Sequence, residues 1–107
     1  MDTVEQINHT IKENPIVIFM KGSPEMPQCG FSMQASQALK ACKADFAYVD
    51  VLANPEVRQT LPGISNWPTF PQIFINGELI GGCDIVLDLH QKGELQELVA
   101  SAARREA

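Results

Sequence analysis

The chain has 107 residues, of which 45% are hydrophobic and 20% are charged. This composition excludes a disordered chain, and the length predicts one compact domain over residues 1–107. Eight Lys and Arg against thirteen Asp and Glu give a formal charge of −5, which argues against a nucleic acid partner because such affinity depends on clustered cations.

The chain begins with a predicted helix and a predicted buried strand. Residues 3–13 predict the helix, with Asp2 or Thr3 as its cap and Pro15 at its end. Its apolar stripe consists of Val4, Ile7 and Ile11. The run IVIFM at 16–20 is apolar and rich in β-branched residues, as in a strand that is covered on both faces. A loop rich in proline follows this strand.

The next segments predict a parallel βαβ unit. Residues 30–43 predict a helix that begins beside Cys29, and residues 46–51 predict a second strand. The apolar face of this helix consists of Phe31, Ala35, Leu39 and Cys42. A strand, a helix and a strand in this order form a crossover whose two strands are parallel.

Short helices frame the second half of the chain. Residues 54–61 predict a helix with Asn54 as its cap, and this helix should end at Pro62-Gly63 because both residues disfavour helix continuation. Further helical segments are predicted at 84–90 and 94–104.

Between these helices, Asn76-Gly77 predicts a two-residue hairpin turn that joins strands at 72–75 and 78–82. The hairpin makes the second half of the sheet antiparallel. The complete order predicts an α/β, thioredoxin-like fold, in which a four-stranded mixed sheet is flanked by helices on both faces.

This fold places Cys29 at the carboxyl edge of the sheet, where open α/β sheets bind their ligands. The free amides and the dipole of the following helix favour a thiolate and lower the pKa of Cys29, and Lys21 adds a cation at the same edge. The alternative is a cysteine that merely begins a helix. Ser32 occupies the second cysteine position of a C-x-x-C motif, so exchange through an internal dithiol is closed. Ser32 either donates a hydrogen bond to the thiolate or satisfies backbone groups in the first helical turn.

The cysteine count and the start of the sequence indicate the cellular compartment in which the protein is expected. Three cysteines at irregular spacing make a poor disulfide framework and suit a reducing environment, with Cys42 expected to be a buried structural residue. No leader or membrane-spanning run is evident. We therefore expect a cytoplasmic protein with no membrane partner.

Two segments, KGSPEMPQCGFS at 21–32 and WPTFPQIFINGELIGGCD at 67–84, resemble monothiol glutaredoxins of the CGFS type, in their bacterial single-domain form. The likeness covers nearly the whole chain. It implies a glutathione site beside Cys29 and a [2Fe–2S] cluster bound in a glutathione-bridged homodimer, with Cys29 as the catalytic residue and the cluster ligand. It also implies BolA-type proteins and iron–sulfur recipient apoproteins as partners.

Glutathione has two carboxylates, one ammonium and a peptide-like backbone, and the sequence offers groups for each. Lys21 and Arg58 can pair with the glycyl carboxylate, although Arg58 alone is equally consistent with a solvated helix charge. By resemblance, Pro71 is cis and the backbone of Thr69 and Phe70 pairs with the cysteinyl part of glutathione.

The other end of glutathione is expected at the start of the last helical region. The free amides at Cys83 and Asp84 can hold the γ-glutamyl carboxylate, and the Asp84 side chain can bind the ammonium or serve as a plain helix cap. Cys83 is expected to contribute its backbone rather than its sulfur, with pairing to Cys29 under oxidation as the alternative.

Three functions remain open at this point, one of them a passive interaction module whose partners, by resemblance, would be BolA-type proteins. A [2Fe–2S] centre ordinarily takes four thiolates, which two Cys29 and two glutathione thiols supply in a dimer, so we favour an iron–sulfur carrier. The alternative is a glutathione-dependent oxidoreductase in which Cys29 attacks a glutathione mixed disulfide.

Overall fold

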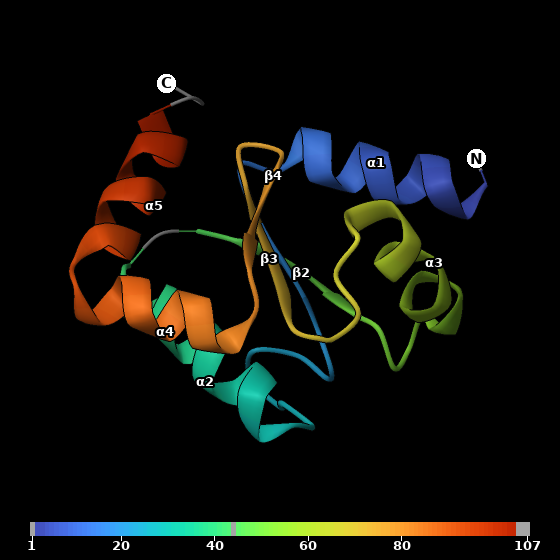
Figure 1. Ribbon diagram of the computed structural model, residues 1–107, viewed down its shortest axis with the longest axis horizontal. Coiled ribbons are helices and arrows are strands. Elements are labelled where there is room, and N and C mark those ends of the chain that lie inside the picture. Colours follow the sequence, from blue (N-terminus) through green and yellow to red (C-terminus); the bar gives the residue numbers. More distant parts are fainter. Residues whose placement is uncertain (1, 44, 105–107) are drawn as a thin grey trace.

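The structure, a computed structural model, describes residues 2–43 and 45–104. These residues contain one sheet of four strands in the order β2-β1-β3-β4 (Figure 1). The strands are β1 Ile16–Met20, β2 Ala47–Asp50, β3 Gln72–Ile75 and β4 Glu78–Gly81. β1 pairs with β2 in parallel, whereas β3 is antiparallel to both β1 and β4. The mixed sheet predicted from the sequence is confirmed.

Helices cover both faces of this sheet (Figure 1). They are α1 Thr3–Glu13, α2 Gly30–Ala41, α3 Pro55–Ser65, α4 Cys83–Gln91 and α5 Glu94–Arg104. Helices α2, α4 and α5 share one hydrophobic cluster with the sheet, and α1 and α3 share the other. Within the described part of the chain, no helix has both the length and the apolar character needed to cross a membrane.

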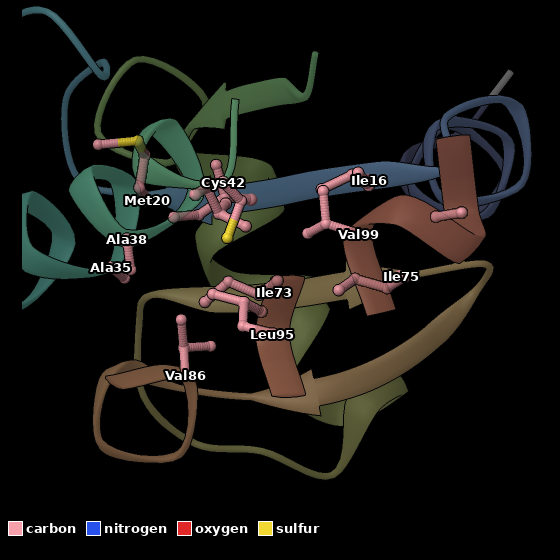
Figure 2. Packing of buried hydrophobic residues seen from close by; sticks show 13 residues of the cluster. Ile16, Met20, Ala35, Ala38, Cys42, Ile73, Ile75, Val86, Leu95 and Val99 are labelled. Carbon is pink, nitrogen blue, oxygen red and sulfur yellow. The ribbon is translucent and has the colours of Figure 1, made fainter. Parts of the chain in front are cut away.

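The central strand β1 connects the two clusters because its side chains alternate between the faces. Ile16, Ile18 and Met20 pack with α2, α4 and α5, and Figure 2 shows Ile16 and Met20 in this cluster. Val17 and Phe19 point to the other side and pack with α1 and α3. All five residues of β1 are buried, as its continuous apolar sequence predicts.

Local hydrogen bonds explain several element boundaries. The Asp2 carboxylate, not Thr3, caps α1 by accepting from the Glu5 amide at 2.8 Å. The hairpin turn at Asn76-Gly77 has positive φ at both residues, 53° and 80°, which is the geometry that Asn-Gly favours.

The predicted end of the third helix is wrong. Helix α3 continues through Pro62-Gly63 to Ser65, and Asn66 ends it in the left-handed conformation with φ 55°. A proline within a helix removes its own amide donor and crowds the carbonyl four residues before it, and the packing of Val57 and Leu61 against the sheet outweighs these costs. Asn54 precedes the helix, but its side chain donates to the Asp50 carbonyl instead of capping.

Two predicted core residues are exposed. Val4 is 44% exposed, so only Ile7 and Ile11 of the α1 stripe enter the core. Phe31 is 61% exposed. It shares a helical face with Ala35 and Leu39 but lies in the first turn of α2, beside a hollow rather than over the sheet.

Candidate functional site

The loop between β1 and α2 delivers Cys29 to the edge of the sheet. Its two ends are joined by the Gln28 amide, which donates to the Lys21 carbonyl at 2.9 Å, and by a bridge between Gly22 and Pro27. Gly22 has φ +88°, and a Cβ there would lie 2.5 Å from the Met26 carbonyl oxygen. Glycine is therefore required for the loop to close upon itself.

Cys29 is the residue that immediately precedes α2, and its thiol is half-buried. The backbone amide of Ser32 is the main cause of a lowered pKa for the Cys29 thiol, with smaller contributions from the Phe31 amide and the Lys21 charge. Burial opposes this lowering without reversing it. The helix start therefore stabilises a thiolate, as the sequence predicts.

The side chain of Ser32 bonds a backbone group, but one outside the helical turn that the sequence suggested. Its side chain is fully buried, and its Oγ accepts a hydrogen bond from the Lys21 amide at 3.1 Å. Its hydroxyl also makes the smallest contribution to the lowered pKa of Cys29. The residue that replaces the second cysteine thus ties the end of β1 to the first turn of α2.

Cys29 opens into a hollow of about 630 Å³ at the carboxyl edge of β1. The segments around it come from the β1–α2 loop, α3, the loop before β3 and the start of α4. All eight residues that the sequence predicted for the site line this hollow, namely Lys21, Cys29, Arg58, Thr69, Phe70, Pro71, Cys83 and Asp84. The structure therefore brings the predicted residues together, while their roles in binding stay predictions.

Charges of both signs line the hollow without being neutralised. Among the described residues, none forms an ion pair with Lys21, Arg58 or Asp84. Arg58 and Asp84 are exposed and Lys21 is half-buried. The hollow therefore offers two cations and one anion to a ligand with both kinds of charge.

The loop before β3 forms one wall of the hollow. The Phe70–Pro71 peptide bond is cis, as the sequence resemblance implied. Gln72, the first residue of β3, is fully buried, and its Nε2 donates to the carbonyls of Trp67 at 2.8 Å and Thr69 at 3.2 Å.

The other two cysteines differ chemically from Cys29. Both are buried, and burial is the main cause that raises the pKa of each thiol. Nearby negative charge on Asp84 and Cys29 raises the pKa of Cys83 further, and its Sγ donates to Gln34 Oε1 at 3.6 Å. Cys42 lies in the core, as predicted. Of the three, Cys29 is the thiol poised to react.

Other lining residues were not assigned to the site from the sequence. They are Phe31, Pro62, Trp67, Pro68, Gly82 and Ile85. Phe31 and Ile85 are exposed apolar residues at the starts of α2 and α4. Within the residues that the structure describes, no three His, Cys, Asp or Glu side chains gather closely enough to hold a metal ion.

Comparisons with known proteins agree with this geometry. The model of the family described as Glutaredoxin matches residues 16–80. Glutaredoxin 4 of Escherichia coli (strain K12) is 57% identical over 103 residues, which cover 96% of this chain and 90% of that protein. Glutaredoxin 4 of Haemophilus influenzae (strain 86-028NP) is 56% identical over 107 residues, the full length of both chains.

The solved structures give the same result for the fold. The solution structure of reduced poplar apo GrxS14 is 44% identical and superposes with a TM-score of 0.80, covering 94% of this chain and 92% of that one. The thioredoxin-like fold predicted from the order of elements is confirmed.

Proposed function

This chain belongs to the glutaredoxin family, as a monothiol member with CGFS at residues 29–32, and on that premise we propose that it binds glutathione and a bridging [2Fe–2S] cluster. Its function is then the assembly, storage or transfer of iron–sulfur clusters. One observation supports this most strongly: a thiol with a lowered pKa opens into a hollow lined by unpaired charges.

Glutathione fits the charges of the hollow. Lys21 and Arg58 are cations for its glycyl carboxylate, and Asp84 is an anion for its ammonium group. Asp84 also lies in the first turn of α4, whose free amides favour a carboxylate. Between these ends, the backbone at Thr69 and Phe70 would pair with the peptide-like cysteinyl part of glutathione.

The chemistry of the thiols favours a shared cluster. A [2Fe–2S] centre takes four thiolates, and a single chain presents one accessible thiolate because Cys42 and Cys83 are buried with raised pKa values. Two Cys29 and two glutathione thiols complete the set in a homodimer. Because glutathione is a diffusible ligand that can exchange, a cluster bound in this way can be transferred to another protein. Cys29 lines an open hollow, so its thiolate is accessible to such a cluster.

The partners proposed for this function follow from the transfer itself. A recipient apoprotein must reach the rim of the hollow, where Phe31 and Ile85 are exposed. We include BolA-type proteins and iron–sulfur recipient apoproteins among these partners, and place the protein in the cytoplasm.

Anaerobic reconstitution with iron, sulfide and glutathione tests the proposal. The wild-type protein should form a coloured dimer, observed by visible absorbance and size-exclusion chromatography. Cys29→Ser should form none, whereas Cys42→Ala should still form it because Cys42 lies in the core, away from the hollow. A colourless wild-type monomer, or a coloured Cys29→Ser dimer, would show that the proposal is wrong.

A matched pair of charge variants tests the glutathione site. Asp84 and Asp88 are both exposed on α4, but only Asp84 lines the hollow. Asp84→Asn should weaken glutathione binding by about 1–3 kcal/mol, the usual worth of a charged hydrogen bond. Asp88→Asn should leave the affinity unchanged. Equal affinities for both variants and the wild type would remove Asp84 from the site.

A glutathione-dependent thiol-disulfide oxidoreductase is the second candidate, and the lowered pKa of Cys29 favours it because the thiolate is the nucleophile. The Cys29 thiolate would attack the glutathione sulfur of a mixed disulfide and release the substrate protein as a thiolate. A second glutathione thiolate would then attack the Cys29–glutathione disulfide and leave as oxidised glutathione. Substantial turnover that Cys29→Ser abolishes would support this function, and negligible wild-type turnover would exclude it.

A further inference from the structure

Gln72 is a fully buried polar residue in a strand whose other three residues, Ile73, Phe74 and Ile75, are apolar. Its side-chain amide faces the loop that forms one wall of the hollow. The Nε2 group donates to the Trp67 carbonyl at 2.8 Å and to the Thr69 carbonyl at 3.2 Å. Of the two polar ends of the glutamine amide, only the NH₂ group can donate to carbonyl oxygens. The orientation of the amide is therefore fixed by its partners.

The contact with Thr69 determines which way the next backbone amide points. The Thr69–Phe70 peptide bond is trans, so its C=O and N–H groups point in opposite directions. Because the carbonyl points inward to Gln72, the Phe70 N–H points away from the interior. Among the described residues, none accepts a hydrogen bond from this N–H, and Phe70 lines the hollow.

Gly82 also packs against this loop. A Cβ at Gly82 would lie 3.3 Å from both the Pro71 carbonyl oxygen and Trp67 Nε1, so the start of α4 packs tightly against the loop. The loop is therefore in contact with both the side chain of Gln72 and the backbone of Gly82.

Glutamine at this position brings an unfavourable contribution as well as its two hydrogen bonds. Its Oε1 is one of two buried side-chain polar atoms without a hydrogen-bond partner in the described part of the chain, the other being Trp67 Nε1. Leaving a buried acceptor unpaired is unfavourable, and an apolar side chain at the start of β3 would avoid it. An apolar side chain would, however, lack the two hydrogen bonds to the carbonyls of Trp67 and Thr69.

We propose that Gln72 is a positioning residue, which fixes the loop 67–71 so that the Phe70 N–H is presented to the ligand in the hollow. The identity of that ligand as glutathione rests on the proposed function. The orientation of the loop does not, because it follows from hydrogen bonds within the chain.

Three variants of the full chain test this role. Gln72→Met keeps the length of the side chain and removes the donor. Gln72→Glu places a carboxylate against two carbonyls, but its protonated form regains one O–H donor. Ile75→Val is the control, since it also alters a buried β3 residue but at the end of the strand away from the loop.

Two readouts are compared for each variant: glutathione affinity by NMR titration, and order of the backbone at 67–70 by ¹⁵N relaxation. For Gln72→Met we expect about a tenfold loss of affinity, the worth of roughly one hydrogen bond, and increased loop mobility. For Gln72→Glu, affinity relative to wild type should recover as pH falls from neutrality and the carboxyl becomes protonated. Ile75→Val should match the wild type in both readouts.

Gln72→Met with wild-type affinity and wild-type loop order would overturn the proposal. So would an affinity loss in Ile75→Val as large as that in Gln72→Met, because the effect would then be general destabilisation. If the wild type fails to bind glutathione, the proposed function fails, and the relaxation data still decide whether Gln72 orders the loop. If Gln72→Met fails to fold, the pH dependence of Gln72→Glu decides. An affinity of Gln72→Glu for glutathione that stays in constant ratio to the wild-type affinity as pH falls would overturn the proposed role of Gln72.

Discussion

Ser32→Ala separates the structural and electrostatic roles of the residue that replaces the second cysteine. The substitution removes the Oγ that accepts from the Lys21 amide at 3.1 Å. Ser32 is fully buried, so water does not replace the lost acceptor without rearrangement. The substitution also removes the hydroxyl, which makes the smallest contribution to the lowered pKa of Cys29, while the larger contribution from the Ser32 backbone amide remains.

Ser32→Ala should therefore have a large effect on the free energy of unfolding and a small effect on the pKa of the Cys29 thiol. An unpaired buried amide costs about 1–3 kcal/mol, which in a domain of this size lowers the midpoint of thermal unfolding by roughly 4–13 °C. The pKa of Cys29 should rise slightly and stay below its ordinary value of 9.0. Calorimetry measures the first effect, and the pH dependence of Cys29 alkylation by iodoacetamide measures the second.

Ser36→Ala is the matched control in the same helix. Ser36 is also fully buried, but its hydroxyl donates to the Met33 carbonyl at 3.1 Å, so its removal leaves no backbone amide unpaired. We expect a loss below about 1 kcal/mol. If Ser32→Ala is no less stable than Ser36→Ala, or if the pKa of Cys29 returns to its ordinary value, this account of Ser32 is wrong.

Three further predictions concern Cys29, the loop and the rim. Because the native pKa of Cys29 is lowered, the unfolded chain binds more protons between that pKa and the ordinary value of 9.0, so the stability of wild type relative to Cys29→Ser should rise with pH across this window. Urea unfolding at several pH values tests this, and a constant difference would contradict it. Gly22→Ala should lose about 2 kcal/mol or more in urea unfolding, because φ is +88° and the Met26 carbonyl oxygen is 2.5 Å from the new Cβ. Gly63→Ala, which meets open space in a helix, should be neutral or gain about 0.5–1 kcal/mol, and equal midpoints for the two variants would refute the difference. Phe31→Ser should change stability by less than about 0.5 kcal/mol, since the side chain is 61% exposed. If Phe31 lies at the interface of the proposed cluster-linked dimer, the same variant should weaken that dimer in analytical ultracentrifugation, and an unaffected dimer would place Phe31 outside the interface.

Some elements could be predicted from the sequence because a short local pattern determines them. The run at 16–20 predicts a strand that is buried on both faces, and Asn76-Gly77 predicts the hairpin. The position of Cys29 follows from the order of strand, loop and helix. In each case the signal lies within a few residues and tertiary packing reinforces it.

Other features depended on contacts that periodicity does not contain. Phe31 has the spacing of a core residue, but spacing does not show where a helix extends past the sheet that it covers. Pro62 signals a helix end, yet packing carries α3 three residues further. The signal for Gln72 was present as a polar residue in the apolar segment QIFI, but its partners became evident only when the loop was placed beside it.

The structure separates what activates the thiol from what recognises its ligand. The pKa of Cys29 is lowered mainly by backbone amides of the first turn of α2, within three residues of the sulfur. The charges at Lys21, Arg58 and Asp84 come from three other segments, and the Lys21 charge contributes less to the thiol than the amides of Ser32 and Phe31. Because the thiolate depends mainly on backbone amides and, of these charges, only on that of Lys21, the charges of Arg58 and Asp84 remain available to a charged ligand. Substitutions of Arg58 or Asp84 can therefore change ligand affinity while the reactivity of Cys29 stays nearly constant, which suits the proposed use of glutathione both as a cluster ligand and as a reductant.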